Sequence, residues 1–107
     1  MQKLTKNAIL DALSRLDNSV IVQLPLPTTP LKTQQWVAQF SRYFNLVPSK
    51  DDWGADRYQV VLTPASNNAL EACLLNIEWM CEAIWLEPVS KQLSAQEILE
   101  YLGKFRD

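Results

Sequence analysis

The chain has 107 residues, of which 48% are hydrophobic and 21% are charged, and its formal net charge is −2. This length predicts a single domain over residues 1–107, and the scattered Lys and Arg residues exclude the basic surface that nucleic-acid binding needs. The absence of histidine excludes Ser-His-Asp and Cys-His catalysis and histidine-ligated metals, and the two glycines, Gly54 and Gly103, cannot form the glycine-rich turns that bind nucleotides.

The first part of the chain predicts a helix, a strand and a stiff connector. Apolar residues recur at helical spacing over residues 4–16, with Ile9 and Leu13 on the same side. Residues 20–24, VIVQL, are apolar and rich in β-branched side chains, which indicates a short buried strand. Residues 25–30, PLPTTP, form the connector, because prolines cannot donate hydrogen bonds to a sheet and hold the residues before them extended.

The most amphipathic segment of the chain predicts a helix over about residues 33–45. Thr29 or Thr33 can cap its start, and Pro30 lies near the first turn, where proline is tolerated. An aromatic stripe at helical spacing belongs to the core far more often than to a ligand site. The residues on this side are Trp36, Val37, Phe40, Tyr43 and Phe44.

Residues 47–56, VPSKDDWGAD, predict a polar loop. Its acidic residues Asp51, Asp52 and Asp56 do not follow the spacing of a calcium-binding loop, so we expect no metal here. A tryptophan in such a loop either packs back over the core or marks a contact surface. We expect Trp53 to pack back over the core.

Residues 57–62 predict a strand, and residues 64–68 a turn that leads into the most apolar stretch, residues 72–88, ACLLNIEWMCEAIWLEP. Two structures suit this stretch. It alternates with period two, as in a hairpin that turns near Trp79 to Glu82, and its composition also suits one helix. We favour the hairpin, because the helix would leave only two strands, and a two-stranded sheet is marginally stable.

In the hairpin, one face of residues 72–88 is apolar and is expected to point inward. It consists of Cys73, Leu75, Ile77, Trp79, Cys81, Ala83 and Trp85. The opposite, mixed face consists of Leu74, Met80, Ile84 and Leu86 with Asn76, Glu78 and Glu82. Both cysteines are therefore expected to be buried, reduced thiols rather than a disulfide.

A capping box at Ser94 and Glu97 predicts the start of a last helix. The expected order is helix, strand, helix, strand, strand, strand, helix. The fold class is therefore α+β, a two-layer sandwich with an about four-stranded mixed or antiparallel sheet and helices mainly on one face.

Glu78 and Glu82 are neighbours in both the hairpin and the helix, and tryptophans surround them. Apolar surroundings raise the pKa of a carboxyl group, so this pair is a candidate binding or acid–base site, with Arg57 or Trp53 at its rim. The alternative is that both carboxylates are solvated on the outer surface.

We therefore expect a small soluble interaction or accessory module without enzymatic activity, which binds a protein partner or forms a homodimer through the mixed sheet face. The chain lacks an apolar run of roughly 20 residues and the apolar core of a signal peptide, so we expect a cytoplasmic protein that does not bind membranes. No cofactor, metal or nucleic acid is expected. The alternative function is a small ligand-binding protein or a carboxylate-based enzyme that uses Glu78 and Glu82.

Overall fold

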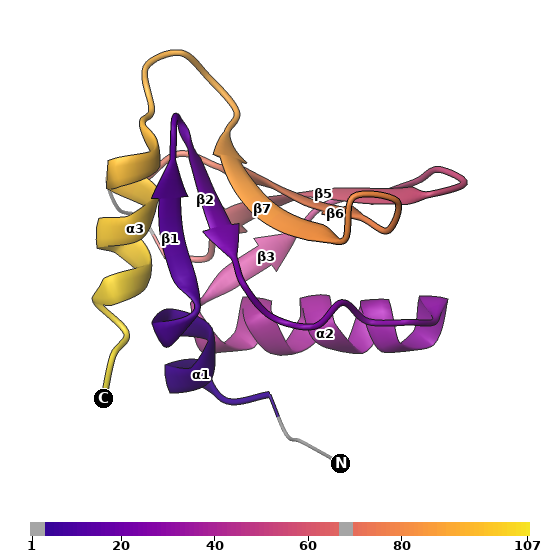
Figure 1. Ribbon diagram of the computed structural model, residues 1–107. Helices are drawn as coiled ribbons and strands as arrows, with labels where there is room; N and C mark the ends of the chain where they lie inside the picture. Colours follow the sequence, from indigo (N-terminus) through magenta and orange to yellow (C-terminus); the bar gives the residue numbers. More distant parts are fainter. Residues whose placement is uncertain (1–3, 67–69) are drawn as a thin grey trace.

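The computed structural model describes residues 4–66 and 70–107 (Figure 1). The elements in chain order are α1 (Lys6–Asp11), β1 (Leu13–Leu16), β2 (Ser19–Val22), α2 (Pro30–Tyr43), β3 (Leu46–Pro48), β4 (Asp52–Trp53), β5 (Arg57–Pro64), β6 (Cys73–Glu78), β7 (Ala83–Pro88) and α3 (Ala95–Gly103). No helix within the described residues is long and apolar enough to cross a membrane.

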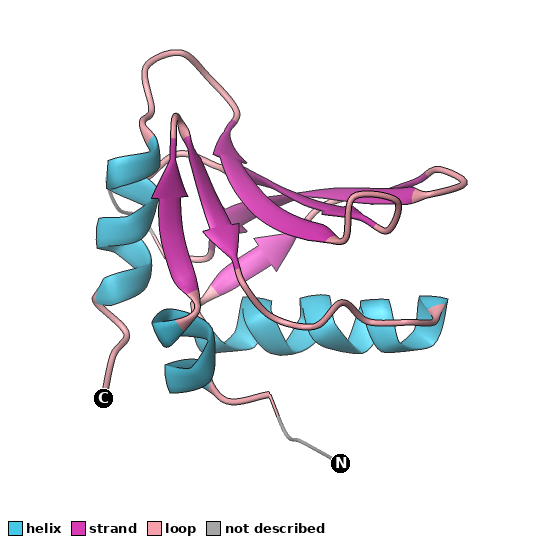
Figure 2. Cartoon of the chain, viewed as in Figure 1, coloured by secondary structure: helices cyan, strands magenta, loops and turns pink. Residues whose placement is uncertain are grey.

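The strands form one antiparallel sheet in the order β1-β2-β7-β6-β5-β3, with β4 paired to β5. Figure 2 shows the helices on one side of this sheet. The α+β class is confirmed, but the expected four-stranded sandwich is not matched, because the described residues form seven strands. The expected element order also omits β1, β3 and β4.

The predicted helix over residues 4–16 is wrong in its second half. Helix α1 ends at Asp11, and Leu13–Leu16 forms strand β1, which pairs with β2 through the turn at residues 17 and 18. Asp17 adopts the left-handed backbone conformation, with φ of 53°, which Asp tolerates better than most residues. The β1–β2 hairpin is therefore more stable here than a longer helix, because a helix of this length is only marginally stable.

The polar loop predicted over residues 47–56 overlaps two short strands. β3 pairs with the end of β5, and the two residues of β4 pair with Tyr58 and Gln59 near its start. Segments of two or three residues are too short to show a periodic pattern in the sequence. They are strands because they pair with β5.

The predicted hairpin over residues 72–88 is confirmed as β6 and β7, with its turn at residues 79–82. The turn has four residues and pairs Glu78 with Ala83, so odd-numbered residues of β6 share a face with even-numbered residues of β7. Ile84 and Leu86 are consequently buried beside Leu75, and the expectation that they lie on the mixed face is wrong. The expectation that Ala83 and Trp85 point inward is wrong for the same reason.

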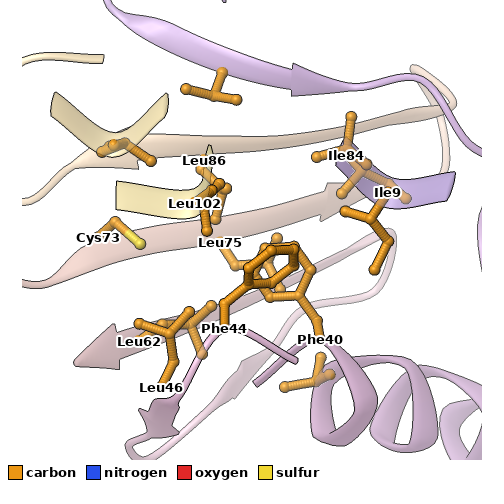
Figure 3. Packing of buried hydrophobic residues seen from close by; sticks show 14 of the residues in the cluster. Ile9, Phe40, Phe44, Leu46, Leu62, Cys73, Leu75, Ile84, Leu86 and Leu102 are labelled. Atoms are coloured by element: carbon orange, nitrogen blue, oxygen red, sulfur yellow. The ribbon is translucent and has the colours of Figure 1, made fainter. Parts of the chain in front are cut away.

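One core lies between the inner face of the sheet and the helices. Figure 3 shows Phe40 of α2 and Phe44, which caps the end of this helix, gathered with Leu75 of β6 and Leu102 of α3. The predicted core role of the aromatic stripe is thereby confirmed for Phe40 and Phe44, which are fully buried. The Tyr101 hydroxyl donates to the carbonyl oxygen of Phe44 at 2.7 Å and links α3 to the end of α2.

The helix starts follow the predicted caps. The Thr29 hydroxyl accepts from the backbone N–H of Lys32 at 3.0 Å, so α2 begins at Pro30, three residues earlier than expected. The Ser94 hydroxyl accepts from the N–H of Glu97 at 3.3 Å. Each side-chain oxygen satisfies an N–H group that the first turn would otherwise leave unpaired.

Glu82 occupies the last position of the β6–β7 turn with φ of 50°. A side chain in this left-handed region costs about 1–2 kcal/mol, whereas glycine adopts it freely. We expect Glu82→Gly to raise the free energy of unfolding by about 0.5–1 kcal/mol, after the greater freedom of glycine in the unfolded chain is subtracted. Urea denaturation measures this change. Glu82→Val should lower the free energy of unfolding, and a loss of stability in Glu82→Gly would contradict this account of the turn.

Candidate functional site

The sheet has a second face, opposite the helices, which we call the outer face. Burial alternates along the central strands, and the residues between the buried ones are mostly half exposed. The outer face consists of Ile21 of β2, Trp85 and Glu87 of β7, Leu74, Asn76 and Glu78 of β6, and Arg57, Gln59 and Val61 of β5.

A chain of hydrogen bonds crosses the middle of the outer face. The Arg57 guanidinium donates to Oε1 of Gln59, and Nε2 of Gln59 donates to Oδ1 of Asn76 at 2.7 Å. Nδ2 of Asn76 then donates to Oε1 of Glu87 at 3.0 Å, and also contacts the carbonyl oxygen of Leu74 at 3.3 Å. We call Arg57, Gln59, Asn76 and Glu87 the polar ladder, in which every bond is donated in the same direction, from the cation to the carboxylate.

The strand register brings the members of the polar ladder together. Gln59 lies directly opposite Asn76, and Glu87 lies opposite Leu74, one step along the same face. Asn76 is only 2% exposed although no helix covers it, because Trp85 lies opposite it on β7. Its amide is therefore a buried polar group whose two ends are both hydrogen-bonded, as the low local polarity requires.

The cationic end of the polar ladder lies among carboxylates. Arg57 is opposite Glu78 in the register and forms an ion pair with Asp52 at 3.6 Å. Both members of the ion pair are largely exposed, so water screens it and its contribution to stability is small. Its main effect is to hold the guanidinium at the rim of the outer face.

The predicted site residues lie in three different places. Arg57 and Glu78 are neighbours on the outer face, whereas Glu82 is exposed in the turn. Trp53 is opposite Tyr58 in the β4–β5 pairing, and its ring meets that of Tyr58 edge-on with centroids 4.6 Å apart. At 39% exposure, Trp53 packs against Tyr58 and keeps part of its surface in contact with solvent.

Sequence reasoning missed Gln59, considered Glu87 only as one of several carboxylates near tryptophans, and treated Asn76 only as part of a mixed face. The available signal was a polar residue at the centre of each of two apolar strands, RYQVVL and CLLNIE. Only the register shows that these two amides meet. Among the described residues, no cluster of three or more Cys, Asp or Glu side chains could hold a metal ion.

Glu78 has a direct partner in the turn. The Cys81 thiol donates to Oε1 of Glu78 at 3.3 Å. This hydrogen bond and the negative charge of Glu78 raise the pKa of Cys81. The expected burial of Cys81 is wrong, since a four-residue turn exposes it, whereas Cys73 is buried and burial raises its pKa to about 12.

We expect Asn76→Ala to lower the free energy of unfolding by about 1–3 kcal/mol, because it removes both ends of a buried hydrogen-bonded amide and leaves Gln59 without its acceptor. Urea denaturation measures the change. Ser14→Ala, an exposed truncation on strand β1, is the matched control and should change stability little. Equal stability of the two variants would contradict a structural role for the polar ladder.

We expect Glu78→Gln to lower the pKa of Cys81 and so increase the rate at which iodoacetamide alkylates the native protein at pH 8, because the thiolate is the reactive form. Mass spectrometry should find modification at Cys81 before Cys73. Glu82→Gln is the control and should leave the rate unchanged, since Glu78 alone accepts the thiol proton. Equal acceleration in both variants would show that the two carboxylates act together.

No protein-family model, curated protein or solved structure significantly matches this chain.

Proposed function

We propose that the chain is a non-enzymatic interaction module that forms a two-fold symmetric dimer through the outer face of its sheet. The observation that supports this most directly is the uncovered outer face, where apolar side chains surround hydrogen-bonded polar groups. A sheet with one covered face needs a polar outer face to remain monomeric.

Apolar side chains extend across the whole outer face. Ile21, Leu74 and Trp85 are only half buried, although they lie on central strands. The register also places Leu16 of β1, opposite Ser19, and Val47 of β3, opposite Thr63, on this side of the sheet, where they are 62% and 52% exposed. Apolar side chains interspersed with hydrogen-bonded polar groups, with a tryptophan among them, are typical of protein interfaces.

The polar ladder lowers the free-energy cost of removing water from the outer face. Interfaces lose affinity when polar groups are buried without partners, and the amides of Gln59 and Asn76 already satisfy each other. Asn76 is excluded from water before any partner binds. The polar groups at the centre of the proposed interface therefore need no new hydrogen bonds.

The two ends of the polar ladder have opposite charges, which suits a second copy in two-fold symmetry. In such an interface, if one residue contacts another in the second copy, the reverse contact also forms. A two-fold axis that passes over Asn76 would set Arg57 of each copy against Glu87 of the other. Charge complementarity of this kind selects the partner and the orientation.

The charged ends provide the test. The wild-type chain should form a dimer in size-exclusion chromatography with light scattering. Arg57→Glu and Glu87→Arg should each weaken dimerisation at least tenfold, a loss of about 1.4 kcal/mol, because each sets like charges against each other. The double variant should bind more tightly than either single variant, since it exchanges the two ends, although the new carboxylate at position 57 lies beside Glu78 and Asp52. Its polar ladder can also re-form, because the amides of Gln59 and Asn76 donate equally well after a flip.

Matched charge reversals elsewhere are the controls for this experiment. Arg42→Glu on α2 and Glu100→Arg on α3 change exposed residues of the helices and should leave the dimer constant unchanged. A wild-type monomer at every concentration would refute the proposal. A double variant that binds no more tightly than the single variants would refute the two-fold pairing of Arg57 with Glu87.

The alternative function, ligand binding or acid–base catalysis by Glu78 and Glu82, has weaker support. Glu78 is engaged with the Cys81 thiol, and Glu82 lies in an exposed turn. The groove that the structure contains beside α2 is lined by neither of them.

A further inference from the structure

The groove beside α2 lies away from the outer face and has a composition of its own. Residues 23–29, between β2 and α2, run alongside α2 in the opposite direction (Figure 1). The space between this connector, Leu4 and α2 is an open groove of about 380 Å³. This is within the range of roughly 300–1,000 Å³ that small-molecule sites occupy.

Both walls of the groove are held in place by hydrogen bonds. The indole Nε1 of Trp79 donates to the carbonyl oxygen of Pro27 at 2.7 Å, which ties the connector to the β6–β7 turn. The Tyr43 hydroxyl donates to the carbonyl oxygen of Leu4 at 2.6 Å and accepts from Nε2 of Gln39 at 2.8 Å. Prolines further stiffen the connector. The groove is therefore largely pre-formed, which lowers the entropy lost when a ligand binds.

The groove combines an apolar interior with a polar rim along one helix. Trp36 lines it and stacks on Phe40 with ring centroids 5.3 Å apart, and the connector contributes Pro25 and Leu26. Lys32, Gln35 and Gln39 of α2 follow one another along the edge. An apolar pocket with a few polar groups on one side suits a ligand with an apolar body and one polar end.

The charge at one end of the groove is positive and uncompensated. Lys32 is the only charged residue in the lining, and it forms no ion pair within residues 4–66 and 70–107. It lies in the first turn of α2, which contains no acidic residue. The helix dipole adds positive potential at the same end. A cation at this position opposes the dipole, and an anion bound there would offset both.

We propose that this groove binds a small monocarboxylic acid with an aromatic body. The carboxylate lies against Lys32, with Gln35 within reach as a further donor, and the ring packs between Trp36 and the connector prolines. A carboxylate satisfies the free ammonium group, and aromatic rings pack well against tryptophan and proline. A dicarboxylate or a phosphate is disfavoured, because the groove offers one cation and an apolar interior.

The 107-residue chain labelled with ¹⁵N can be titrated with 4-phenylbutyrate and followed by nuclear magnetic resonance. Saturable shifts are expected at the Trp36 indole and at the side-chain amides of Gln35 and Gln39. The indoles of Trp53 and Trp85, which lie outside the groove lining, should not shift. Saturable shifts at Trp53 or Trp85 instead, or no saturable shift up to the solubility limit of the acid, would overturn the proposal.

A variant and a second probe separate charge recognition from simple apolar binding. Lys32→Met should weaken 4-phenylbutyrate binding at least fivefold, whereas Lys91→Met, an exposed lysine outside the groove, should not change it. The neutral 4-phenylbutyramide should bind the wild type at least fivefold more weakly than the acid and should be insensitive to Lys32→Met. Equal affinities for the acid and the amide would overturn the assignment of a carboxylate. The outcome does not depend on the oligomeric state.

Discussion

The four-residue turn between β6 and β7 is the constraint on which the rest of the sheet depends. It pairs Glu78 with Ala83 and so inverts the parity between the two strands. Ile84 and Leu86 enter the core beside Leu75, which closes the inner face against the helices. A turn with one residue more or fewer would move the whole apolar set of β7 to the solvent side.

The same register creates the polar ladder. With Trp85 opposite Asn76 in the register and Glu87 hydrogen-bonded to it, an amide in the middle of a mostly apolar strand is buried and has its hydrogen bonds satisfied. Networks of this kind are costly when one partner is missing, so they favour one pairing of strands over its slipped alternatives. The hydrogen-bonded polar groups of the outer face therefore depend on the correct pairing of β5, β6 and β7.

The β6–β7 turn also contacts the connector between β2 and α2. Through its indole, Trp79 holds the connector at Pro27, and this contact shapes one wall of the groove beside α2. The two proposed surfaces therefore share one structural origin. We propose a second copy of the chain as the partner of the outer face and a small acid as the ligand of the groove, and neither proposal requires an enzymatic reaction.

The sequence by itself determined the features that depend on neighbouring residues. The caps at Thr29 and Ser94, the core side of α2 and the extended character of β5 follow from local hydrogen bonding and side-chain periodicity, whereas residues 72–88 suited a helix as well as a hairpin by local pattern. Tertiary structure decided the rest. β1, β3 and β4 exist as strands because a neighbouring strand satisfies their backbone groups, and Gln59 meets Asn76 only through the register. Local patterns specify which face a residue takes within its strand, but long-range pairing determines which residues meet across strands.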